Sequence, residues 1–121
     1  MADNRDYRVR AFLYIENEGI ALGLYDHVLE QKEDAVDINP DTPHAEMRLV
    51  EFGDAHIVEY DLAFPPEEQG KARGLFNHSK NINAVKYPDA EEGMQTGYVS
   101  LERCGHRIKE SCEIIERYDV E

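Results

Sequence analysis

The first patterned segment of the chain alternates between apolar and polar residues over positions 7–16. Successive side chains of a strand point to opposite faces, so this alternation predicts a β-strand with one buried face. Phe12 and Tyr14 lie among the polar positions, and we expect the second face to be partly covered too. The apolar side carries Tyr7, Val9, Ala11, Leu13 and Ile15.

Beyond Gly19 the apolar residues change to a helical spacing. Ile20, Leu24 and Val28 are four residues apart, which predicts an amphipathic helix from Ile20 to about Glu33. Asn17 stands just upstream, where its side chain can cap the first turn. Gly23 lowers helix stability by about 1 kcal/mol relative to Ala, so a strand is the alternative for this segment.

Two further strands are predicted in the middle of the chain, after a loop in the Pro- and Asp-rich residues 34–44. They cover Glu46–Phe52 and Ala55–Phe64 and are joined at Gly53-Asp54, while Pro65-Pro66 ends the second strand. One face of the second strand carries His56, Val58, Tyr60, Leu62 and Phe64.

The next segment, Gln69–Pro88, contains no Asp or Glu, although the chain has 26 acidic residues and a formal net charge of −13. Its glycines and asparagines predict a long structured loop that includes one short helical turn. We call it the acid-free segment. A basic segment on an acidic protein can bind an acidic surface of another copy or a small anion, and a solvated polar loop is the alternative. The predicted subunit or ligand contacts are Lys71, Arg73, His78, Lys80 and Lys86.

The C-terminal part predicts a β-hairpin. Gln95–Cys104 and Arg107–Asp119 flank Gly105-His106, a Gly-X pair suited to a type II′ turn. The predicted fold is therefore a single α+β domain over residues 1–121, with a mainly antiparallel curved β-sheet or small β-barrel and one short helix.

The amino-acid composition limits the classes of partner that the protein can bind and indicates its cellular location. The excess of acidic residues argues against direct binding of nucleic acid, which needs a basic face, and against anionic membranes. No apolar run is long enough to span a bilayer, and the N-terminus lacks an apolar signal core. Two cysteines are too few for a disulfide framework, which favours a reducing compartment and a cytoplasmic location.

Catalytic and cofactor motifs are not evident. Gly70-Lys71 lacks the spacing of a P-loop, and neither a dinucleotide fingerprint nor a G-x-S-x-G elbow is found. Cys104, His106 and Cys112 form a C-x-H-x5-C pattern, which is not a standard zinc spacing even with another histidine as fourth ligand. We therefore expect no enzyme activity, no catalytic residue, no cofactor and no metal.

One family shares the order of these elements. The chain runs through a strand (YRVRAFLYIEN), a short helix (ALGLYDHVLEQ), a loop, the segment MRLVEFGDAHIVEYDLAF and a strand beginning GMQTGYVSLE. This order resembles the tube protein of type VI secretion systems, the hemolysin-coregulated protein family, in its short Bacteroidetes form. The closest stretch is Leu49 to Phe64. The resemblance implies a curved barrel, hexameric rings that stack into a tube, and export by a specialised secretion machine or incorporation into a phage-like particle.

Three functions are consistent with these features. The first is a self-assembling structural protein of the tail-tube type, forming homo-oligomeric rings through contacts between acidic and basic surfaces. The second is a small acidic binding or inhibitor protein, a phage-type antagonist or nucleic-acid mimic, that presents Glu30–Asp41, Glu110, Glu113 and Glu116 to a protein partner. The third is an α+β barrel that binds an anionic small ligand in a pocket lined by Tyr14, His56, Tyr60 and His78.

Overall fold

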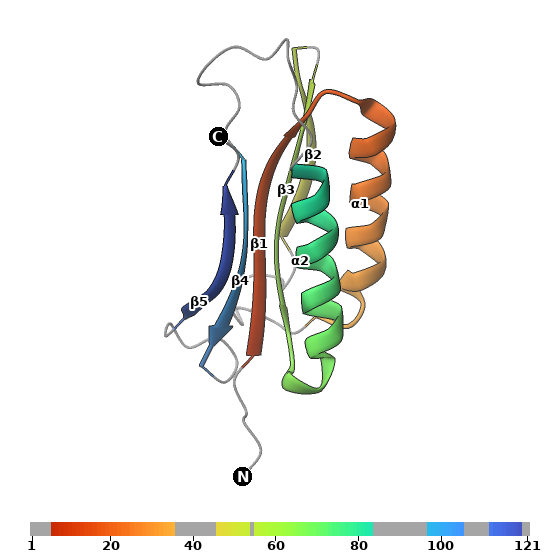
Figure 1. Ribbon diagram of the computed structural model, residues 1–121. Coiled ribbons are helices and arrows are strands. Elements are labelled where there is room, and N and C mark those ends of the chain that lie inside the picture. The colour runs from red at the N-terminus through yellow and green to blue at the C-terminus, as the bar shows by residue number, and fades with distance from the viewer. Residues whose placement is uncertain (1–5, 36–45, 54, 84–96, 106–111, 120–121) are drawn as a thin grey trace.

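A five-stranded antiparallel sheet with both helices on one face is the architecture of this protein (Figure 1). The computed structural model describes residues 6–35, 46–53, 55–83, 97–105 and 112–119. The curved sheet confirms the predicted α+β class. In chain order the elements are β1 (Asp6–Ile15), α1 (Glu18–Lys32), β2 (Glu46–Phe52), β3 (Ala55–Phe64), the 3₁₀ turn η1 (Pro66–Glu68), α2 (Gln69–Asn83), β4 (Tyr98–Cys104) and β5 (Glu113–Asp119).

The strand order in the sheet is β2-β3-β1-β4-β5. The first four strands and the two helices form a β-α-β-β-α-β unit of the ferredoxin-like, split βαβ type, and β5 extends it beside β4. β1 is central: it pairs with β3 from Tyr7↔Phe64 to Ile15↔His56, and with β4 on its other side. Of the two predicted architectures, the described strands form the open sheet, with β2 and β5 at its edges.

The first helix agrees with the sequence prediction. The Asn17 side chain accepts a hydrogen bond from the backbone N–H of Ile20 at 3.0 Å, as expected for an N-cap. Ala21, Leu24 and Val28 are buried against the sheet. The gain from burying this stripe outweighs the cost of Gly23, so the alternative of a strand is excluded.

The second helix corrects the prediction of a long loop in the acid-free segment, because residues 69–83 form α2 instead. The glycines lie on its exposed side, where they are tolerated, and a buried stripe at helical spacing stabilises the helix. The buried side chains are Ala72, Leu75, Phe76 and Ser79. Residues 84–88 of the acid-free segment lie outside the described part of the chain.

The hydrophobic core lies between the helices and one face of the sheet. Alternate residues of the three inner strands point into it, which confirms the predicted apolar faces of β1 and β3. Its largest fully buried side chains include Tyr60, Phe64, Phe76, Leu13, Ile15 and Leu24.

The hairpin of β4 and β5 is present, but the predicted two-residue turn is wrong. A Gly105-His106 turn would place Cys104 opposite Arg107, whereas the register places Arg103 opposite Glu113. The longer connection allows Cys112 to pack with Cys104 and Ala63 in a small second cluster. Residues 106–111 lie outside the described part of the chain.

Candidate functional site: the open face of the sheet

The face of the sheet that α1 and α2 leave uncovered carries most of the described arginines. On β1, Val9 and Leu13 point toward the helices, so Arg8, Arg10 and Phe12 point the other way. The neighbouring strands contribute side chains in register with these residues. We call this surface the open face, and its main residues are Arg48, Val50, Glu59, Asp61, Arg8, Arg10, Phe12, Tyr14, Tyr98, Ser100, Glu102, Arg117 and Asp119.

Arginine–carboxylate pairs run across the open face. Arg8 donates to Asp61 through two hydrogen bonds, from Nε to Oδ1 at 2.8 Å and from Nη2 to Oδ2 at 2.5 Å. Arg10 binds Glu102 in the same bidentate way, at 2.8 and 2.7 Å. Such fork-to-fork pairs fix orientation as well as charge. With Arg48–Glu59 and Arg117–Asp119 they form what we call the charge ladder.

Glu102 is the most informative member of the ladder, because it is 4% exposed. Burial acts to raise the pKa of its carboxyl, but the hydrogen bonds and charge of Arg10, together with the bond from Ser100, outweigh burial and leave that pKa lowered. The same hydrogen bond raises the pKa of Arg10. Both groups are therefore ionised at neutral pH.

A hollow of about 680 Å³ lies in the middle of the open face. Arg10 and Arg48 line it together with Glu59, Asp61 and Tyr98. The guanidinium of Arg117 lies 4.7 Å from the centre of the Tyr98 ring, in cation–π geometry. The hollow thus offers both signs of charge and an aromatic surface.

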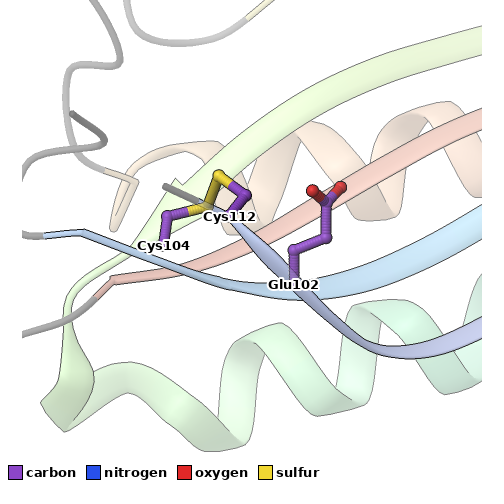
Figure 2. A group of neighbouring side chains, drawn as sticks. All are labelled: Glu102, Cys104 and Cys112. Carbon is purple, nitrogen blue, oxygen red and sulfur yellow. A yellow bond between two sulfur atoms is a disulfide. The ribbon is translucent and has the colours of Figure 1, made fainter. Parts of the chain in front are cut away.

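One end of the open face holds a disulfide between Cys104 and Cys112 (Figure 2). This single bridge was not predicted from the sequence, where the cysteine count indicated only that two are too few for a disulfide framework. Pairing of β4 with β5 brings the two sulfurs together. The Glu102 carboxylate lies beside them on the same face (Figure 2). The compartment stays a prediction, and His106 lies outside the described residues.

Four of the residues predicted as contacts (Lys71, Arg73, His78 and Lys80) lie on α2, in the helical layer and away from the open face. Lys71 binds Asp34 and also lies 3.4 Å from Glu68, while Arg73 binds Glu116. Two of the predicted contact residues therefore have acidic partners within their own molecule.

For the other two predicted contacts on α2, Lys80 and His78, the described part of the chain provides no acidic partner. Lys80 lies half-buried on α2, and Lys86 lies outside the described residues. The His78 ring lies 4.4 Å from the ring of His27 on α1, centre to centre. Partial burial, and then the proximity of His27, lower the pKa of His78. The structure brings these two helices together but gathers no basic cluster among the described residues.

The pocket predicted for an anionic ligand is not formed by the residues named for it. Tyr14 lies on the open face, whereas His56 and Tyr60 point toward the helices and His78 is exposed on α2. Of the proposed acidic surface, Glu113 and Glu116 lie on β5, and Glu110 lies outside the described residues.

Sequence reasoning missed the ladder, although its signal is visible. Arg8 and Arg10 alternate with apolar residues on one strand, and Glu59 and Asp61 do the same on another. Two strands with complementary charges on their polar faces indicate cross-strand ion pairs. Only the strand order shows that these strands are neighbours.

No family model, curated protein or solved structure matches this chain. Within the described ranges, neither helix has the length and apolar character needed to cross a bilayer.

Proposed function

We propose that the protein is a non-enzymatic assembly protein in which the open face of one copy binds the open face of another. The charge ladder carries this proposal. Its four ion pairs combine four arginines with four carboxylates, whereas the whole chain has a net charge of −13. The ladder is therefore neutral on a molecule that is otherwise acidic.

This neutrality favours a contact between identical faces. Two copies with a charge of −13 each repel one another wherever acidic surfaces meet. A two-fold contact requires a surface that complements itself, and alternating arginines and carboxylates meet that requirement. The side chain of Val50, 41% exposed, adds apolar area next to the ladder.

The resemblance to tube proteins supports self-assembly in general, but a ring needs a different kind of contact from the two-fold contact of the open faces. Ring closure joins two different patches on each subunit. The acid-free segment was predicted to supply one such patch, and its Lys71 and Arg73 bind acidic groups of their own molecule. We therefore expect a two-fold dimer as the first step of assembly.

Sedimentation velocity at low and high protein concentration tests the dimer. We expect Arg48→Glu to shift the protein to monomer, because it places a like charge beside Glu59 and within the contact. Lys80→Glu changes the net charge by the same amount on α2 and serves as the matched control. A wild-type monomer at all concentrations contradicts the proposal, as does an equal effect of both variants.

The hollow favours one alternative function, the binding of a small ligand that carries negative charge. Its volume of about 680 Å³ lies within the usual range of ligand sites, roughly 300–1,000 Å³. Arg10, Arg48 and Tyr98 would orient an anionic ring. A thermal-shift screen of nucleotides and phosphorylated metabolites tests it, since a ligand of the native state raises the melting temperature. A monomer that gains stability with such a ligand would favour this alternative.

A further inference from the structure

The end of the open face brings together three side chains with metal-binding atoms. One carboxylate oxygen of Glu102 and the two sulfurs of Cys104 and Cys112 all lie within 4.8 Å of one another. Cys104 and Glu102 are buried, and Cys112 is partly buried. Figure 2 shows the carboxylate and the sulfurs on the same side of β4.

Reduction changes what these atoms can bind. In the disulfide each sulfur is bonded to the other and carries no charge. A dithiol reductant breaks this S–S bond by supplying two electrons and two protons, and its own sulfurs become a disulfide. Cys104 and Cys112 are then two thiols next to a carboxylate.

We propose that, once this disulfide is reduced, Glu102, Cys104 and Cys112 bind one zinc ion. The two thiols lose their protons and coordinate the metal as thiolates, and Glu102 supplies an oxygen. Water occupies the fourth position. Tetrahedral zinc with bonds of about 2.3 Å to sulfur and about 2.1 Å to oxygen places its ligand atoms roughly 3.6–3.8 Å apart. Small side-chain rotations reach this spacing from a cluster that spans 4.8 Å.

The charges of the site favour a divalent cation. Two thiolates and one carboxylate carry −3, which is costly in a buried place. Zn²⁺ contributes +2 and the bound Arg10 contributes +1, so the complete site is neutral. Thiolate ligands also select zinc over the hard cations Mg²⁺ and Ca²⁺.

Arg10 acts here as a positioning residue. Its two hydrogen bonds hold both oxygens of Glu102. Oε2 also accepts from Oγ of Ser100 at 3.1 Å, so Oε1 is the oxygen that keeps a second lone pair for a metal. Outer partners of this kind orient ligands at known metal sites. In this site a carboxylate, Glu102, takes the ligand position that the C-x-H-x5-C sequence pattern would give to a histidine.

Cobalt(II) is a suitable probe, because thiolate ligands give it an intense near-ultraviolet charge-transfer band. The full chain, reduced with a phosphine and kept free of oxygen, is titrated with Co²⁺ and compared with the oxidised protein. We expect a band that saturates at one equivalent in the reduced protein only, and that disappears on addition of Zn²⁺.

Variants then assign the ligands. Glu102→Gln should weaken Co²⁺ binding about tenfold or more, and Cys112→Ser should remove most of the band. Glu113→Gln is the matched control. Glu113 is exposed on β5 and lies opposite Arg103, which is on the helix-facing side of the sheet, so Glu113 lies on the other side of the sheet from Glu102.

Two results would overturn the proposal. The first is a failure of reduction to matter: the oxidised and the reduced wild-type protein bind Co²⁺ equally, or neither binds it. This comparison uses the wild-type protein alone, so it makes no assumption about how a variant folds. The other is an equal affinity of Glu102→Gln and Glu113→Gln, which would remove Glu102 from the site. Neither result depends on whether the protein dimerises.

Discussion

The hydroxyl of Tyr60 lies in the core beneath α2, 2.5 Å from Oγ of Ser79, and the tyrosine is 2% exposed. Burial raises the pKa of this phenol, against the smaller lowering effect of the Ser79 hydrogen bond. A buried hydroxyl that loses its partner costs about 1–3 kcal/mol, whereas removing both polar groups together costs much less.

This pair gives the first prediction. Ser79→Ala should lower the free energy of unfolding by about 1–3 kcal/mol. Tyr60→Phe should also be destabilising, and the double variant should be more stable than the sum of the two single losses implies. Urea unfolding of the four proteins measures this cycle. Additive single losses would show that the two hydroxyls do not interact.

Glu102 gives a prediction about pH. Its pKa in the folded protein is lowered from the ordinary value of 4.5, so its contribution to stability is present above about pH 4.5 and is lost as pH falls through the lower, folded value. Melting temperatures between neutral pH and pH 3 should therefore fall less steeply for Glu102→Gln than for the wild type. Glu113→Gln removes one carboxylate from β5 in the same way and is the control for the change in net charge.

At the scale of elements, the pattern of apolar and polar residues was sufficient to predict three of the five strands. β2 and β3 have the predicted bounds, and β1 differs by one residue at each end. Their patterns are clear because each of these strands buries one face against the helices. The N-cap of α1 was visible for a similar reason, since Asn17 acts on a residue three positions away.

Features that depend on distant residues could not be predicted in this way. Arg8 and Asp61 are 53 positions apart, and Arg10 and Glu102 are 92 apart. Their pairing follows from strand order, which no local pattern specifies. α2 was missed for a local reason: its glycines and asparagines indicate a loop, and the stabilising stripe of Ala72, Leu75 and Phe76 is short.

Two glycines give a prediction at this scale. Gly53, in the turn between β2 and β3, has φ of 60°, a conformation that costs a residue with Cβ about 1 kcal/mol or more. Gly23 lies on the exposed side of α1, where an added Cβ meets nothing within 4 Å. Gly53→Ala should therefore destabilise the protein, and Gly23→Ala should stabilise it by about 0.5–1 kcal/mol. Thermal unfolding of both variants measures the two opposite shifts, and shifts of the same sign would contradict this assignment.

At the scale of the whole molecule, the net charge of −13 dominates the electrostatics. Salt screens the repulsion among surplus carboxylates and also weakens exposed ion pairs. The exposed pair Arg48–Glu59 is worth at most about 1 kcal/mol, and bidentate pairs that are partly buried, such as Arg8–Asp61, are screened less. The repulsion should therefore be the larger effect.

We expect the melting temperature to rise between 0.05 and 0.5 M salt, by roughly 4 °C for each 1 kcal/mol of repulsion relieved. NaCl and KCl should act equally, because screening depends on ionic strength rather than on ion identity. Scanning calorimetry provides the measurement. A falling melting temperature would show that the ion pairs contribute more than the repulsion costs.

The central place of β1 in the sheet also governs how this chain folds during synthesis. β1 is made before the other described strands, yet one of its neighbours, β3, ends at Phe64, and the other, β4, ends at Cys104. Its hydrogen bonds to β4 can form only after most of the chain has left the ribosome. Contacts between residues so far apart in sequence slow folding. Until then one edge of β1 stays unpaired, and its apolar side is covered only once α1 and α2 have been made.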